Sequence, residues 1–155
     1  MCEDKAMNTQ DHQRRAAEIE AEETRLSFTK FDFADAWAIG RKLVESAPAP
    51  VAIRIVLADR VLFAASLDGT SADNALWLDH KLNAVKHFGR SSLWLHHNLR
   101  AKGKVLAEIP AGCMAMADHG GGFPIRIGSQ TIGAIGVSGL PHEEDHRLIV
   151  RALSD

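Results

Sequence analysis

Residues 119–146 read HGGGFPIRIGSQTIGAIGVSGLPHEEDH, and this stretch combines two strand patterns with a hairpin turn and a helix start. The segments 123–127 and 131–137 are rich in branched apolar residues, and Gly128-Ser129-Gln130 between them is typical of a hairpin turn. Pro141 is suited to the first turn of a helix. An antiparallel hairpin brings its last residues back beside its first, so we expect this helix to begin close to the three glycines.

The same periodicities extend over the rest of the chain. Asp32 and Ser71 have the residue type of helix N-caps, and Gly89 and Gly103 are typical helix stops. The predicted helices cover about 11–24, 33–47, 72–88, 93–102 and 141–153, and the predicted strands cover 51–57, 61–65, 123–127 and 131–137, with 26–29 as a candidate for a further short strand. This order predicts an α/β (α+β) protein with one antiparallel sheet and helices packed on it.

Composition limits the function classes. The 155 residues fit one domain, which we place at 11–155 behind a disordered tail of residues 1–10. A net charge of −2 without a basic stripe argues against nucleic acid as a partner. No run reaches the roughly 18 apolar residues of a membrane span, and no secretory signal is visible, so we expect no membrane partner and a cytoplasmic location. Cys2 and Cys113 form neither a disulfide framework nor a metal motif.

The first predicted helix points to self-association. Residues 14–23 are rich in Ala, Glu and Arg and contain few large apolar side chains. Such a helix has high helix propensity but too little apolar surface for the core of its own subunit. We therefore expect it to contact a second copy, in a homo-oligomer that is a dimer or larger.

Several spaced blocks of the sequence resemble a known family. The blocks are Thr70-Ser71-Ala72-Asp73-Asn74 with Trp77, Lys81 and Asn83, then Phe88-Gly89-Arg90-Ser91-Ser92, then His119 to Ile125, then Gly133 to Pro141 with Glu144-Asp145-His146. Together they resemble the GlcG/HbpS-like haem-degrading-domain family, in its branch of short single-domain proteins, over residues 20–153. The resemblance implies a profilin-like fold, with an antiparallel sheet of about five strands flanked by helices, in symmetric homo-oligomers. Because some members bind or degrade haem, it makes haem a candidate cofactor.

His119 and the glycines after it are the leading candidate site. Three successive backbone N–H groups at Gly120, Gly121 and Gly122 can hold an anion while the imidazole donates, relays a proton or binds a metal. Alternatively, the glycines only let the loop turn tightly into the strand that begins at Phe123, and the histidine is structural.

Phe123, directly after the glycines, and four further residues complete the predicted ligand-binding set. Asp145 and His146 match a family block, and the hairpin predicts that they lie in one cluster with His119. Lys81 is a candidate charge partner for that cluster, and Lys81 and Asn74 match the family and are candidates to line a pocket above the sheet. For Asn74 the alternative is the third position of the helix capped by Ser71, where its side chain reciprocates the cap.

The other histidines carry weaker signals. His142 and His146 share a helix face at a spacing used by paired metal ligands, but the rest of a zinc motif is missing, so we predict no metal site. His80 and His87 are placed on a solvated flank, and at most one of His96 and His97 can face the core.

Three functions remain open at this stage. The first is a small-molecule or cofactor-binding protein, with haem as the candidate ligand and a pocket between helix 71–89 and the loop before Phe123. Haem needs an axial ligand, and the chain has eight histidines but no tyrosine. The second is an enzyme acting on a small organic acid with His119 as acid/base, and the third is a non-catalytic homo-oligomeric assembly protein. The sequence does not decide whether the protein is an enzyme.

Overall fold

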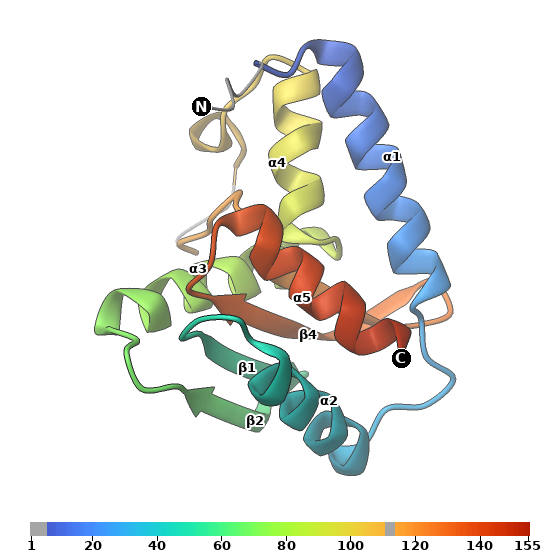
Figure 1. Ribbon diagram of the computed structural model, residues 1–155. Coiled ribbons are helices and arrows are strands. Elements are labelled where there is room, and N and C mark those ends of the chain that lie inside the picture. Colours follow the sequence, from blue (N-terminus) through green and yellow to red (C-terminus); the bar gives the residue numbers. More distant parts are fainter. Residues whose placement is uncertain (1–5, 111–113) are drawn as a thin grey trace.

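The computed structural model describes residues 6–110 and 114–155. In chain order its elements are α1 (Thr9–Arg25), α2 (Phe33–Ser46), β1 (Ala52–Leu57), β2 (Arg60–Ser66), α3 (Ala72–Phe88), α4 (Ser92–Ala101), the 3-10 turn η1 (Leu106–Glu108), β3 (Gly122–Ile127), β4 (Gln130–Ser138) and α5 (His142–Ser154). The strands form an antiparallel sheet in the order β2-β1-β4-β3 (Figure 1). This arrangement confirms the predicted α+β fold with helices on an antiparallel sheet.

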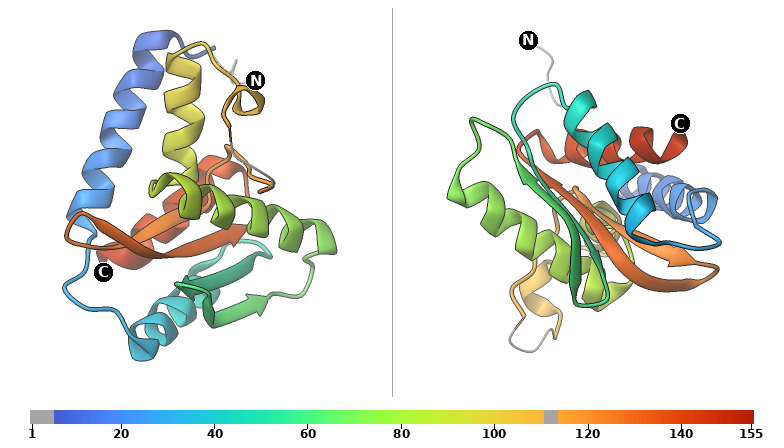
Figure 2. Two further views of the ribbon diagram at one scale, coloured as in Figure 1. Left: turned by 180° about the vertical axis from the view of Figure 1, so that it is seen from behind. Right: turned by 90° about the horizontal axis from the view of Figure 1, so that it is seen from below.

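Helices cover both faces of the sheet (Figure 2). On one face α2 and α5 bury the larger apolar cluster, which includes Ile53, Ile55 and Ile135 of the central strands. On the other face α3 packs its Leu78, Leu82 and Val85 side chains on β1 and β4. A Cβ at Gly136 would lie 2.6 Å from Leu78, so glycine at this strand position lets α3 approach the sheet closely.

Local signals set the helix ends as predicted. Asp32 accepts a hydrogen bond from the Asp35 amide, and Asp35 reciprocates. The Ser71 amide donates to Asn74 Oδ1 at 2.9 Å, which is the capping role considered for Asn74. Gly89 takes a left-handed conformation (φ 68°) at the end of α3, where a residue with a Cβ is disfavoured.

The position of the first helix, α1, differs from the prediction. α1 lies along α4 and also contacts β3, and its Ile19 side chain is fully buried (Figures 1 and 2). The expectation that this helix has too little apolar surface to join its own subunit is therefore wrong, because α4 supplies a facing surface that the α1 sequence does not reveal. The helix also begins at Thr9, inside the tail predicted for residues 1–10; residues 1–5 of that tail and Cys113 lie outside the described residues.

Two further differences are small. The predicted short strand at 26–29 is a single bridge, in which Phe28 pairs with Ile127 at the β3 edge, so the sheet has four strands rather than about five. The hairpin turns fall at Ala58-Asp59 and Gly128-Ser129, close to the predicted positions. Within 6–110 and 114–155, we find no helix that has both the length and the apolar character to span a bilayer.

Candidate functional site

Five histidines from four parts of the chain meet at one end of the molecule. We call them the histidine cluster: His12 from α1, His96 and His97 from α4, His119 from the loop before β3, and His142 from the first turn of α5. The ring centroids of His96 and His142 are 4.6 Å apart, and those of His119 and His142 are 5.3 Å apart. His12 and His97 face each other with their Nδ1 atoms 2.9 Å apart.

Asp118 orients His96 and lies beside His119. The Asp118 carbonyl oxygen lies 3.0 Å from His96 Nδ1, and because a carbonyl only accepts, this nitrogen carries the proton. In the neutral ring the His96 Nε2 atom then holds a free lone pair. His119 Nδ1 lies 3.6 Å from an Asp118 carboxylate oxygen and has no hydrogen-bond partner within the described residues, although the atom is buried. A histidine that donates one ring N–H to the protein, as His96 does, is typical of a metal-binding imidazole.

Burial keeps part of the cluster neutral. Removal from water, with the nearby charge of Arg100, lowers the pKa of His96 to about 3. Burial and the neighbouring His119 also lower the pKa of His142, whose Nδ1 atom accepts the Gly120 amide at 3.0 Å. At neutral pH both rings are therefore uncharged. His96 keeps a free lone pair on Nε2, whereas His142 uses its lone pair on the Gly120 amide and carries its proton on Nε2.

A chain of hydrogen bonds connects the cluster to α1 through Glu143. The buried His97 ring meets Glu143 Oε1 at 3.0 Å, and Arg15 donates to Glu143 Oε2 at 3.0 Å. Burial acts to raise the pKa of Glu143, but the hydrogen bonds from His97 and Arg15 outweigh it and lower this pKa to about 2. Because the carboxylate only accepts, His97 donates through Nε2, which leaves its Nδ1 atom as the acceptor for His12 in the neutral ring.

Lys81 and Asp145 form a buried ion pair beneath the glycine loop. Lys81 Nζ lies 2.9 Å from Asp145 Oδ2 and also donates to the Val137 carbonyl at 3.2 Å. Asp145 Oδ1 accepts the Leu140 amide. A Cβ at Gly121 would lie 2.9 Å from Lys81 Nζ, and this glycine has a φ of 125°, so the position requires glycine on both grounds. The predicted role of Lys81 as a charge partner is therefore met by Asp145.

The glycine loop does not provide the predicted anion cradle. The Gly120 amide donates to His142, and the Gly122 amide donates to Ser92 Oγ at 2.8 Å. Two of the three N–H groups are therefore used inside the protein, and the Gly121 carbonyl accepts the Val137 amide. The interpretation of the glycines as a tight connection into β3 fits these contacts better than the ligand-holding one.

The predicted grouping of His119 with Asp145 and His146 is met only in part. His146 is buried and points toward α1, where its Nε2 atom pairs with Glu22 at 3.0 Å, and its ring packs near Phe123 at 5.7 Å between centroids. His119 instead meets His142 and His96, and it packs beside Trp77 at 5.4 Å. His142 and His146 lie four residues apart on α5, but their neighbours differ. His142 contacts His119, whereas His146 contacts α1.

Sequence reasoning overlooked most of the cluster. His96, His142 and Asp118 were not in the predicted ligand-binding set, although the His96-His97 doublet and the histidine after Pro141 were visible signals. Of the predicted set, Phe123 lies in the apolar core, and Asn74 caps α3. His97 is the buried member of its pair, as expected for one of the two.

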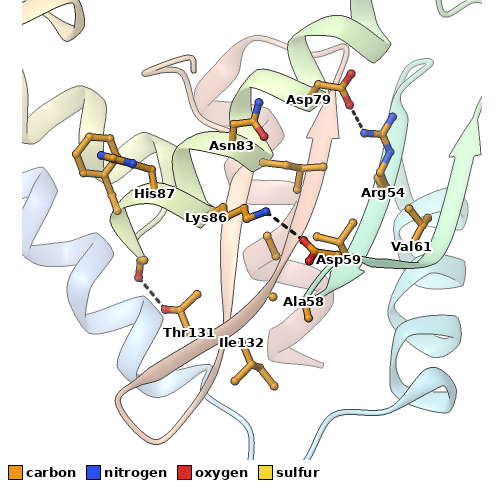
Figure 3. Close-up of a pocket in the computed structure, with 16 residues that line it drawn as sticks. Arg54, Ala58, Asp59, Val61, Asp79, Asn83, Lys86, His87, Thr131 and Ile132 are labelled. Carbon is orange, nitrogen blue, oxygen red and sulfur yellow. Dashed lines mark hydrogen bonds and ion pairs between the residues drawn. The ribbon is translucent and has the colours of Figure 1, made fainter. Parts of the chain in front are cut away.

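A separate groove of about 910 Å³ lies on the α3 face of the sheet (Figure 3). Its floor comes from β1, β2 and β4, and its wall is α3. Lys86 pairs with Asp59 at 3.1 Å, and Arg54 pairs with Asp79, so both ion pairs join the sheet to α3 across the groove. None of the lining residues belongs to the histidine cluster or to the loop before Phe123, so this groove is not the pocket predicted between α3 and that loop.

Most of the chain matches a known protein family. Residues 31–154 match the family described as "Haem degrading protein HbpS-like". The chain belongs to this family. The match confirms the resemblance that the motif blocks predicted.

Relatives and solved structures agree with this assignment. The UPF0303 protein SCO2848 of Streptomyces coelicolor is 45% identical over 142 residues, which cover 88% of this chain and 90% of that protein. The crystal structure of the Ybr137w protein superposes with a TM-score of 0.76 at 26% identity, covering 96% of this chain and 94% of the other. The structure of a PduOC:heme complex superposes with a TM-score of 0.68 at 22% identity, covering 80% and 93%, which shows a shared fold.

Chelation by three or more side chains is not supported here. Across residues 6–110 and 114–155, no group of three or more His, Cys, Asp or Glu side chains is arranged to hold a metal ion. An iron that a macrocycle already coordinates needs only one or two protein ligands. The arrangement of His96 and His119 suits that smaller requirement.

Proposed function

We propose that this protein binds haem, or a similar flat iron-bearing cofactor, at the histidine cluster, with His96 and His119 as candidate iron ligands. The observation that carries the proposal is the fixed ring of His96, whose Nδ1–H group donates to the Asp118 carbonyl and leaves Nε2 free. Haem supplies the redox and oxygen chemistry when bound, and the chain supplies ligands and orientation.

The charge state of the cluster supports iron binding. An imidazole must be neutral to donate its lone pair, so metal affinity falls where protons compete. With its pKa lowered to about 3, His96 is neutral at pH 7, so protons do not compete with iron for its free lone pair. Arg100 donates to the Asp118 carboxylate at 3.2 Å and so helps to hold the residue that orients His96.

An exposed aromatic ring beside the ligands supports a flat aromatic partner. Trp77 is about half-exposed and lies 5.4 Å from His119 between ring centroids. Exposed tryptophan next to a half-exposed imidazole offers a stacking surface that a porphyrin can cover. The family match and the haem-bound PduOC neighbour point to the same class of ligand.

The proposal is tested by titrating hemin into the purified protein. We expect a sharp Soret band that saturates near one haem per subunit. His96→Ala and His119→Ala should each broaden or shift the band and weaken binding, whereas His87→Ala, an exposed histidine on α3 outside the cluster, should leave it unchanged. Circular dichroism verifies that each variant is folded.

A broad shift that never saturates and that both cluster variants leave unaltered would remove haem as the ligand. The alternative of an enzyme on a small organic acid loses its main support in the structure, because the amides of Gly120 and Gly122 are already bonded. The histidine cluster alone does not favour that reaction over binding.

A further inference from the structure

The groove on the α3 face of the sheet lies apart from the histidine cluster and has the size of a small-molecule site. Its cavity of about 910 Å³ falls within the range of known ligand pockets, roughly 300–1,000 Å³. Helix α3 forms the wall, and the β1–β2 hairpin and β4 form the floor (Figure 3). The side chains on these two surfaces therefore decide which class of ligand the groove can hold.

The middle of the groove is apolar. Val56 of β1, Ala134 of β4 and Leu82 of α3 pack in one apolar cluster, and all three line the groove. Val61 of β2 also lines it and is exposed, so the apolar surface continues to the edge of the sheet. A ligand with an apolar body gains affinity by covering this surface, by up to about fourfold for each CH2 group that it removes from water.

Two ion pairs join the floor of the groove to its wall. Arg54 of β1 pairs with Asp79 of α3, and Asp59 of the β1–β2 turn pairs with Lys86 of α3 (Figure 3). The two α3 partners are seven residues apart, which corresponds to about 10 Å along a helix. The charges of the four side chains balance, so the charge of a fitting ligand depends on which partner of a pair is more easily displaced.

The Arg54–Asp79 pair favours an anionic ligand, because its partners differ in exposure. The side chain of Arg54 is 26% exposed and that of Asp79 is 51% exposed. If a ligand carboxylate replaces Asp79, the displaced aspartate is solvated, and little is lost because an exposed ion pair contributes little. If a ligand cation replaced Arg54, the more buried guanidinium would lose its partner, which costs more. A guanidinium also binds a carboxylate through two parallel N–H groups.

We propose that this groove is a second ligand site, which binds a small monocarboxylate with an apolar body. The carboxylate takes the place of Asp79 on Arg54, and the apolar body covers Val56, Leu82 and Ala134. Lys86 is 63% exposed, so water screens its attraction for the anion, and Arg54 fixes the orientation of the ligand. The site is separate from the histidine cluster and does not depend on haem binding.

The test uses three probes that share a chain length and differ in charge: hexanoate, hexanamide and hexylammonium. We expect hexanoate to shift the NMR amide signals of Val56, Leu82 and Ala134 in a saturable way. The neutral and cationic probes should bind about tenfold more weakly, because neither offers Arg54 a charged acceptor. Propanoate, which lacks three CH2 groups, should also bind more weakly than hexanoate. This series needs no substitution and so does not depend on the folding of any variant.

Two substitutions in one ion pair should act in opposite directions. Arg54→Gln should weaken hexanoate binding about tenfold, whereas Asp79→Asn, which removes the competing carboxylate, should tighten it severalfold. Arg41→Gln is the matched control, because Arg41 also pairs with a carboxylate, that of Glu45, but lies on α2 at the other face of the sheet. His96→Ala should leave hexanoate binding unchanged. Circular dichroism verifies that each variant is folded.

The proposal is overturned if hexanoate leaves the groove amides unshifted, or if hexylammonium binds there as tightly as hexanoate. Hexanoate binding that Arg54→Gln leaves unaltered, or that Asp79→Asn weakens, would overturn it as well. Loss of hexanoate binding in folded His96→Ala would place the anion at the histidine cluster instead of the groove, which also contradicts the proposal.

Discussion

At the scale of single residues, the Lys81–Asp145 pair shows how a polar contact can organise a loop. Both side chains are almost completely buried. Burial lowers the pKa of Lys81 and raises the pKa of Asp145, because removal from water disfavours both charges and their mutual attraction offsets only part of the effect. The pair joins α3 to the first turn of α5, directly under Gly121.

Removing one partner of this pair should lower the free energy of unfolding more than replacing both partners with apolar residues. Lys81→Met leaves the Asp145 carboxylate buried without a counter-ion, and we expect the free energy of unfolding to fall by about 3–5 kcal/mol. Lys81→Met/Asp145→Leu removes both charges and should recover much of that loss. Urea denaturation measures both variants. A single-variant loss below about 1 kcal/mol, the value of an exposed pair, would contradict a buried role.

His96 should make the protein sensitive to acid. Its pKa is about 3 in the folded protein against an ordinary value of 6.5, so between these values the unfolded chain binds the extra proton. The stabilising contribution is therefore complete above pH 6.5 and is lost as the pH falls toward 3. His142 and His12, whose pKa values are also lowered, act in the same direction.

His96→Gln should make the loss of stability below pH 6.5 shallower, because the titrating ring is gone. Urea midpoints at neutral pH and at several points between 6.5 and 3 measure the slope. His87→Gln, on the exposed side of α3, should keep the wild-type slope. Equal slopes in the wild type and in His96→Gln would show that burial of His96 does not depress its pKa.

At the scale of elements, the buried carboxylate of Glu23 connects α1 to the start of α4. Glu23 accepts the Ser91 amide at 2.7 Å and the Ser91 hydroxyl at 2.8 Å, and Arg90 donates to its other oxygen at 2.8 Å. Its side chain is fully buried. The carboxylate therefore sits at the start of α4, where a negative charge is favoured by the helix dipole.

Removing this carboxylate should loosen α1 from α4. We expect Glu23→Ala to lower the free energy of unfolding by about 3 kcal/mol, since Arg90 and the Ser91 amide lose their partner. Amides of α1 and of the first turn of α4 should also exchange faster. Glu18→Ala, on the exposed side of the same helix, is the control and should change little. Similar effects of the two substitutions would argue against Glu23 as the attachment point.

At the scale of the whole molecule, assembly should appear in thermal stability. If the chain forms the homo-oligomer that the resemblance to its family implies, the melting temperature of the wild type rises with protein concentration, because association favours the folded state by mass action. Differential scanning calorimetry over a concentration series measures the effect. A wild-type melting temperature that is independent of concentration would contradict assembly at micromolar concentrations.

The sequence by itself determined the elements and the fold class. Hairpins at residues 58–59 and 128–129, the caps at Asp32 and Ser71, and the stop at Gly89 were predictable because each depends on residues within a few positions of one another. Strand and helix periodicity then led to an antiparallel sheet covered by helices, and the motif blocks led to the family.

The tertiary structure alone decided the site and the place of α1. His12 meets His97 across 85 positions of the chain, and Lys81 meets Asp145 across 64. Contacts at such separations depend on how whole elements pack, and no local pattern encodes which face of α5 turns toward α1 and which toward the glycine loop. For that reason His119 was predicted to join His146, and the structure placed it with His142 and His96 instead.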